Sequence, residues 1–142
     1  KEVGIPPESL VLELTESGYI ETDTRIMELF KNLKEKNIDL ALDDFGTGYS
    51  SLSYLKGLPI DTLKIDKSFI DTVITDENTR IITESIIYMV KKLGFETIAE
   101  GVETEEQFRY LNELDCDNIQ GYFLGKPMPS EKIENLLADM TA

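Results

Sequence analysis

The sequence predicts an α/β fold of parallel strands joined by helices, and two observations support this prediction. Short apolar runs alternate with amphipathic stretches along the chain, which is the pattern of consecutive βα units. Polar residues also collect where each apolar run ends. Parallel α/β folds carry their functional side chains at the C-terminal ends of their strands, so both observations favour the same architecture.

Five apolar runs are predicted to be strands because they are short and bounded by turn residues or by helical patterns. They are residues 10–14, 39–45, 62–66, 96–100 and 118–123. Parallel strands require crossover connections, which the amphipathic stretches between these runs provide.

Helices are predicted from apolar residues that recur every three or four positions. The predicted segments are residues 22–36, with Ile26, Leu29, Phe30 and Leu33 on one face, and residues 77–93. A shorter helical stretch is expected at 51–56. Thr104 and Gln107 have the spacing of a capping box that opens a further helix, and Ser130 is a candidate cap for a last one.

The βα pattern alone leaves two architectures open, an open doubly wound sheet and a closed barrel. A barrel of this type needs eight strands and about 250 residues. The chain has 142 residues and five predicted strands. A barrel interpretation therefore requires a front part outside this sequence, and the abrupt start of the chain at Lys1 leads us to expect a larger parent protein.

The composition excludes several classes of function. Acidic residues outnumber basic residues 28 to 14, which argues against DNA, RNA or an anionic membrane as a partner. The chain contains no histidine, so serine–histidine and cysteine–histidine catalysis within it are excluded. Any metal ion must accept oxygen ligands, which favours Mg²⁺, Mn²⁺ or Ca²⁺.

The location of the protein is expected to be cytoplasmic. Cys116 is the single cysteine, and a free buried thiol fits a reducing compartment. The sequence shows no apolar run long enough to cross a membrane and no secretion signal. Other domains of a longer parent can still anchor it to a membrane.

Polar side chains at the strand ends form the candidate site. Carboxylates within a strand are costly unless they are paired or bind a metal ion. Because the C-terminal ends of parallel strands lie together, we expect these side chains to be neighbours. They are Glu13, Glu16, Asp43, Asp44, Lys64, Asp66, Glu100, Glu103 and Gln120.

Each of these residues also has a structural explanation. Gln120 by itself is weak evidence for a functional site. The presence of polar residues at all five strand ends favours a site more strongly than any one residue does. The structural alternatives are an ion pair of Glu13 with Lys64, capping by Glu16, Asp66 or the Asp43–Asp44 pair, and stabilisation of Glu100 and Glu103 by a helix dipole.

A glycine-containing segment, Gly46-Thr47-Gly48, follows the acidic pair. It is either an ordinary βα turn or a mobile loop that places the pair, because glycine permits tight turns. The segment is not a phosphate-binding P-loop, since no Lys-Ser/Thr follows at the required spacing.

Four long runs resemble the EAL family of cyclic di-GMP phosphodiesterases. They are ELTES (13–17), DDFGTGYSSLSYLKGLPIDTLKIDKSFI (43–70), TIAEGVET (97–104) and NIQGYFLGKPMP (118–129). The resemblance implies a modified (β/α)₈ TIM-type barrel, of which residues 1–142 would be the C-terminal five βα units of one domain. It also implies hydrolysis of cyclic di-GMP to linear pGpG with two divalent ions, Mg²⁺ or Mn²⁺.

The resemblance also implies roles for single residues. Glu13 and Asp43 would bind one metal ion, and Asp43 would bridge to a second ion near Asp44 and Glu100. Glu100 would be the general base, and Lys64 would contact the attacking water or the phosphate. Further implied positions are Glu103 and Gln120 in the active site, Glu16 as the residue that holds the loop, and Phe45, Gly46, Thr47 and Gly48 in that loop, which the family uses to link dimerisation to catalysis.

The sequence also departs from the family pattern. The Glu-Ala-Leu motif is not present in this sequence. The family's first strands, which supply an Asn metal ligand and Arg-rich contacts to the substrate, are not present either. We interpret this as truncation, and expect the isolated chain to be weakly active or inactive. A homodimer and an upstream sensory or diguanylate cyclase domain in the parent are also expected.

Two other functions are compatible with the residues. One is a non-catalytic cyclic di-GMP receptor or dimerisation module. The other is an unrelated metal-dependent barrel enzyme, which would require the long motif match to be accidental.

Overall fold

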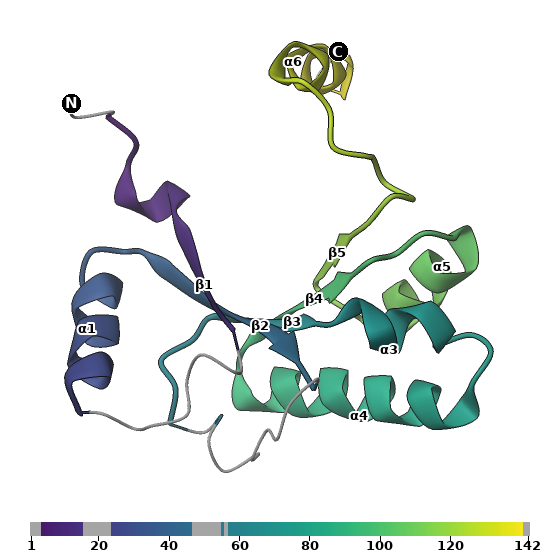
Figure 1. The fold of residues 1–142 in the computed structure, drawn as a ribbon, viewed down its shortest axis with the longest axis horizontal. Helices are drawn as coiled ribbons and strands as arrows, with labels where there is room; N and C mark the ends of the chain where they lie inside the picture. Colours follow the sequence, from purple (N-terminus) through teal and green to yellow (C-terminus); the bar gives the residue numbers. More distant parts are fainter. Residues whose placement is uncertain (1–3, 16–23, 47–54, 56, 141–142) are drawn as a thin grey trace.

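The computed structural model describes residues 4–15, 24–46, 55 and 57–140. The strands in Figure 1 are β1 (Val11–Thr15), β2 (Asp39–Phe45), β3 (Thr62–Ile65), β4 (Glu96–Glu100) and β5 (Asn118–Gln120). The helices are η1 (Pro7–Ser9, a 3-10 turn), α1 (Thr24–Lys34), α3 (Lys67–Thr72), α4 (Glu77–Leu93), α5 (Glu105–Glu113) and α6 (Ser130–Met140).

The described strands form one five-stranded sheet in the order β1-β2-β3-β4-β5. Every neighbouring pair is parallel, which confirms the predicted βα units. A doubly wound sheet reverses its strand order at a switch point, whereas this order follows the chain throughout. The sheet is therefore the barrel-type alternative, seen here as five consecutive strands.

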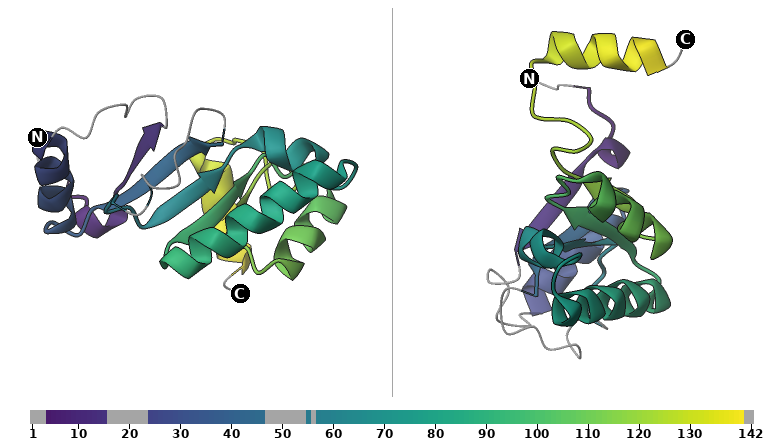
Figure 2. Two further views of the ribbon diagram at one scale, coloured as in Figure 1. Left: turned by 90° about the horizontal axis from the view of Figure 1, so that it is seen from below. Right: turned by 90° about the vertical axis from the view of Figure 1, so that its right-hand side faces the viewer.

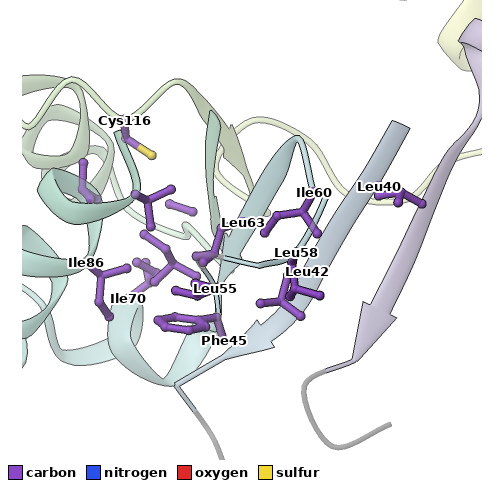
Figure 3. Close-up of a cluster of buried hydrophobic side chains, with 14 of the residues drawn as sticks. Leu40, Leu42, Phe45, Leu55, Leu58, Ile60, Leu63, Ile70, Ile86 and Cys116 are labelled. Atoms are coloured by element: carbon purple, nitrogen blue, oxygen red, sulfur yellow. The ribbon is translucent and has the colours of Figure 1, made fainter. Parts of the chain in front are cut away.

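The hydrophobic core lies between one face of this sheet and the helices that cover it (Figures 2 and 3). Alternate strand residues point to that face because side chains in a strand alternate between faces. The core contains Leu40, Leu42, Leu63, Ile65 and Ala99 from the strands, together with Phe30 of α1, Ile70 of α3, Ile86 and Val90 of α4, and Leu111 of α5. Side chains at the intervening strand positions face the opposite side of the sheet.

The helix ends follow their capping residues. α4 has the predicted bounds, with Asp76 accepting a hydrogen bond from the backbone N–H of Thr79 at its start and Gly94 in a left-handed conformation at its end. The predicted capping box of α5 is confirmed, since both its reciprocal hydrogen bonds are present. At α6 the backbone N–H of Ile133 donates to the carbonyl of Pro129, so Ser130 lies inside the helix and does not cap it.

One predicted strand is shorter in the structure, and one helix of the structure was not predicted. β5 ends at Gln120 and does not reach residue 123, because the chain turns at Gly121, whose carbonyl accepts from the N–H groups of Leu124 and Gly125. The short helix α3 is not among the helices that the sequence predicts. The helical stretch expected at 51–56 lies outside the described residues except for Leu55, which is buried.

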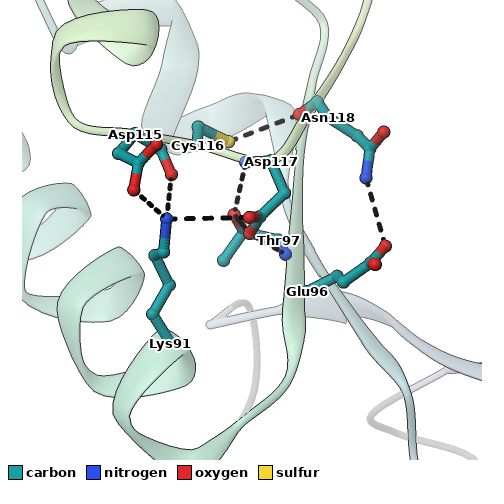
Figure 4. Close-up of polar contacts among 7 residues, drawn as sticks. All are labelled: Lys91, Glu96, Thr97, Asp115, Cys116, Asp117 and Asn118. Carbon is teal, nitrogen blue, oxygen red and sulfur yellow. Dashed lines mark hydrogen bonds and ion pairs between the residues drawn. The ribbon is translucent and has the colours of Figure 1, made fainter.

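A polar network joins the N-terminal ends of β4 and β5 (Figure 4). The Asp117 carboxylate accepts hydrogen bonds from the backbone N–H and the hydroxyl of Thr97, at 2.9 and 2.8 Å, and Lys91 lies 3.6 Å from it. Burial opposes ionisation of Asp117, but these donors hold its pKa below the ordinary value. Asp117 therefore fixes the register of two strands at the end of the sheet opposite the candidate site.

The C-terminal helix α6 stands apart from the sheet (Figures 1 and 2). It is helical as predicted, but its apolar residues Ile133, Leu136 and Leu137 are exposed. The edge strand β1 is also exposed at Val11 and Leu12. Both elements thus present apolar surface that the described part of the chain does not cover. Among the described residues, no helix has the length and apolar character needed to span a bilayer.

Substitution of Gly121 by alanine is expected to destabilise the fold by about 3 kcal/mol, as overpacking does. A Cβ at Gly121 would lie 2.6 Å from the carbonyl carbon of Val102 and would overlap its backbone N and O atoms. Backbone atoms cannot rotate away, so the loop after β4 would have to separate from the end of β5. Urea denaturation followed by circular dichroism measures the loss.

Gly125→Ala is the matched control, because its Cβ would meet only the end of the Met128 side chain at 3.8 Å. Equal stability of the Gly121→Ala and Gly125→Ala variants would contradict the close approach of these two segments.

Candidate metal centre

Three carboxylates from three strands surround the ammonium group of Lys64. Lys64 lies on β3, and its Nζ is 2.8 Å from Glu13 Oε1 of β1, 3.0 Å from Asp43 Oδ1 of β2 and 2.8 Å from Glu100 Oε1 of β4. All four residues were predicted from the sequence to share a site. The structure brings them together on the sheet face opposite the hydrophobic core.

Lys64 is buried, with only 5% of its surface exposed. Burial alone lowers the pKa of a lysine, but the hydrogen bonds from Lys64 to Glu100, Glu13 and Asp43 outweigh it, and the pKa is raised above the ordinary value. Lys64 is therefore a fixed positive charge. Its stabilising effect is fully present below the ordinary lysine pKa and is lost only as the pH rises through the raised value.

A second group of ligand atoms overlaps this cluster. One carboxylate oxygen from each of Asp43, Asp44 and Glu100 lies within 4.8 Å of the others. Hard divalent cations such as Mg²⁺, Mn²⁺ and Ca²⁺ bind oxygen ligands of this kind. Because three acidic oxygens converge and no softer ligand is in the group, the donor set fits a divalent ion of this class.

The convergence of Asp43 and Asp44 needs an irregular backbone, since adjacent side chains of a regular strand point to opposite faces. The pairing of β2 with β3 shifts register between Leu42 and Phe45. Asp44 has a φ of 57°, in the left-handed region that non-glycine residues rarely adopt, and such strain clusters at functional sites. The irregularity at the end of β2 thus directs both carboxylates to one place.

The remaining predicted residues lie around this cluster. Glu13 forms the ion pair with Lys64 that the sequence offered as a structural alternative. It is not part of the three-oxygen group. Gln120 is the register partner of Glu100. Glu103 is half-exposed and pairs with Lys67. The Asp66 side chain accepts a hydrogen bond from the backbone N–H of Ser68 and so caps α3. This is the capping role that the sequence offered as an alternative to a role in the site.

The predicted loop residues divide into two groups. Phe45 is the last residue of β2 and its ring is buried in the core, so it anchors the loop without belonging to it. Gly46 follows with a φ of 96°. Thr47, Gly48 and Glu16 lie outside the described residues.

Comparison with known proteins identifies the family. A family model for the EAL domain matches residues 1–127. The chain belongs to the EAL domain family. The EAL relatives include the oxygen sensor protein DosP of Escherichia coli, which is 41% identical over 137 residues that cover 96% of this chain and 17% of DosP.

Two solved EAL structures share the fold. The structure described as the PaMucR phosphodiesterase in complex with c-di-GMP is 40% identical, with a TM-score of 0.84, and the match covers 91% of this chain and 52% of that one. The manganese and cyclic di-GMP complex of Klebsiella pneumoniae BlrP1 is 31% identical, with a TM-score of 0.77 and coverage of 84% and 31%. The chain thus spans about half or less of these proteins.

Replacement of Lys64 by methionine in this EAL chain is expected to lower stability at neutral pH by roughly 3 to 5 kcal/mol, because it leaves partly buried carboxylates without their cation. Added Mn²⁺ should raise the melting temperature of Lys64→Met more than that of the unmodified protein, since the ion replaces the lost positive charge. Thermal denaturation with and without Mn²⁺ measures both effects.

The exposed Lys36 provides the control, as Lys36→Met removes a lysine away from the cluster. A stability loss in Lys64→Met no larger than in Lys36→Met would show that Lys64 does not hold the cluster.

Proposed function

We propose that the intact parent domain of this chain hydrolyses cyclic di-GMP to linear pGpG with two divalent metal ions, Mg²⁺ or Mn²⁺. The observation that carries the proposal is the convergence of Asp43, Asp44 and Glu100 beside the buried Lys64. Membership of the EAL family and the cyclic di-GMP in the PaMucR complex support the substrate. Manganese in the BlrP1 complex supports the choice of metal.

Electrostatics explains why this site needs cations. Cyclic di-GMP carries two phosphodiester charges, and the strand ends present three carboxylates to a single ammonium, that of Lys64. Such a site repels an anionic substrate. Divalent ions held by Asp43, Asp44 and Glu100 would reverse the local charge and lower the pKa of an attacking water.

The chain's own residues divide the remaining work. The raised pKa of Lys64 keeps it protonated, so it can donate a hydrogen bond to a phosphate oxygen or to the attacking water but cannot accept a proton. The general base must then be a carboxylate. We assign this role to Glu100, whose carboxylate lies beside both Lys64 and the acidic pair. Glu13 orients Lys64 from the other side.

The proposal extends to the context of the site. This chain matches 17% of DosP, an oxygen sensor protein, and 19% of MucR of Pseudomonas aeruginosa, a bifunctional diguanylate cyclase/cyclic di-GMP phosphodiesterase. We therefore infer that a sensory or cyclase domain accompanies the site in a longer, cytoplasmic parent. A homodimer is the inferred assembly. The isolated chain would have weak or no activity, since it spans only part of the solved EAL structures.

Replacement of Asp43 by asparagine, or of Glu100 by glutamine, in the full-length protein is expected to reduce pGpG formation roughly 1,000-fold, within the range that general acid–base catalysis contributes. Asp43→Asn removes a charged ligand of the metal ions, and Glu100→Gln removes both a charged ligand and the proposed general base. Chromatography of the products formed from cyclic di-GMP in Mg²⁺ or Mn²⁺ measures the rate.

The exposed Glu35 supplies a control, since Glu35→Gln removes a carboxylate away from the strand ends. Undiminished turnover in Asp43→Asn would overturn the assignment. If the unmodified protein binds cyclic di-GMP and releases no pGpG, the receptor function replaces the enzymatic one.

The exposed apolar surface of α6 and β1 generates a prediction about assembly. We expect this chain to self-associate at micromolar concentration, because Ile133, Leu136, Val11 and Leu12 leave apolar area in water. Replacement of Ile133 and Leu136 by glutamate should shift the population towards monomer in sedimentation velocity. A monomer before any substitution would contradict the expectation.

A further inference from the structure

The short helix α3 lies against the loops that carry the candidate metal ligands. It follows β3 directly and is capped by Asp66. Lys67 and Phe69, both in its first turn, contact two glycines of positive φ, Gly101 after β4 and Gly46 after β2. These glycines lie one residue after Glu100 and two residues after Asp44. α3 therefore contacts the two segments whose carboxylates must converge on one ion.

The contact with the β4 loop is made at several points. The Lys67 methylene groups lie where a Gly101 side chain would be, and the Lys67 ammonium pairs with Glu103. The buried Gln107 donates to the carbonyl of Ile70 in α3 at 3.0 Å and accepts from the backbone N–H groups of Glu103 and Thr104, the first of these at 2.9 Å. An ion pair, side-chain packing and the hydrogen bonds of Gln107 thus join α3 to the loop after Glu100.

The contact with the β2 loop rests on one aromatic ring. A Cβ built at Gly46 would lie 2.6 Å from Cε2 and 2.7 Å from Cζ of Phe69. The ring therefore lies directly against the Gly46 backbone, where only a glycine leaves space. Phe69 is partly buried and packs against the core at its other side. It links the strained Asp43–Asp44 turn to a helix that is itself fixed to the Glu100 loop.

We propose that Phe69 is a positioning residue that holds the Asp43–Asp44 turn at the distance from Glu100 that a divalent ion requires. This role rests on the proposed function, because it is a role towards the metal ion. Phe69 touches neither ion nor substrate; it acts through Gly46. Outer residues that orient metal ligands typically change metal affinity 10- to 100-fold when they are replaced.

The first test replaces Phe69 by leucine in the full-length protein and measures Mn²⁺ affinity by calorimetry. The dissociation constant is expected to rise at least tenfold. Phe95→Leu is the matched control, since Phe95 is also partly buried against the core but precedes β4 at the opposite end of the sheet. A Phe95→Leu variant of equal thermal stability should bind Mn²⁺ as the unmodified protein does. Equal affinity loss in both variants would overturn the positioning role.

A double-mutant cycle tests the contact itself. Gly46→Ala alone should weaken Mn²⁺ binding, because the new Cβ displaces the ring. In a Phe69→Leu background the same change should cost less, since the smaller side chain leaves room for it. Gly94→Ala is the control, because Gly94 has a similar φ of 85° and its Cβ would meet nothing within 4 Å. If the double mutant changed the Mn²⁺ dissociation constant by the product of the two single-mutant factors, the contact between Gly46 and Phe69 would be ruled out.

A measurement without metal separates this inference from the proposed function. Amide hydrogen exchange across residues 43–46 should be faster in Phe69→Leu than in Phe95→Leu in metal-free buffer. Unchanged exchange overturns the positioning role whether or not ions bind. Faster exchange in a protein that binds no Mn²⁺ overturns the proposed metal-dependent function and leaves the contribution of Phe69 to the turn in place.

Discussion

The buried ammonium of Lys64 is the interaction around which the polar face of the sheet is organised. A lysine that is only 5% exposed can remain charged only if anions surround it. Those anions come from β1, β2 and β4, so the ion pairs join three strands in addition to their backbone hydrogen bonds. The parallel register and the alternation of side chains then determine which face receives charge and which receives the core.

The same cluster differs in one respect from the polar networks at the other end of the sheet. There, Asp61 accepts from Lys34 and from the backbone N–H of Leu40, and Asp117 accepts from Thr97 and pairs with Lys91. Lys34 also pairs with Asp39, and Lys91 with Asp115, so each of these networks has two carboxylates for one ammonium. Backbone and hydroxyl donors stabilise their acidic oxygens. Around Lys64, three carboxylates share one ammonium. This larger excess of negative charge favours a site for cations over a network that only stabilises the fold.

The sequence allowed prediction of elements that depend on local pattern. The bounds of β2, β4 and α4 follow from apolar runs and capping residues, and the strand-end rule brought Glu13, Asp43, Lys64 and Glu100 together. The proximity of Asp43 and Asp44 follows from the same rule and from the family resemblance, but the backbone that produces it could not be predicted, because a left-handed residue inside a strand depends on tertiary contacts. The exposure of α6 could not be predicted either, because its amphipathic pattern is that of a helix with one buried face.

The helix α3 shows why such features escape a sequence pattern. Its six residues are too few to display a helical period, and the pairing of Asp66 with Ser68 at its start is also compatible with an ordinary turn. The contacts of α3 are with glycines 20 or more positions away in the sequence. These contacts form only when the strands lie side by side, so no local pattern reveals them. Gly46 and Gly101 each leave the space that a side chain of α3 fills. Glycine is therefore required at these two positions by a neighbour in space as well as by its own φ, and that double requirement couples the loop after β2 to the loop after β4.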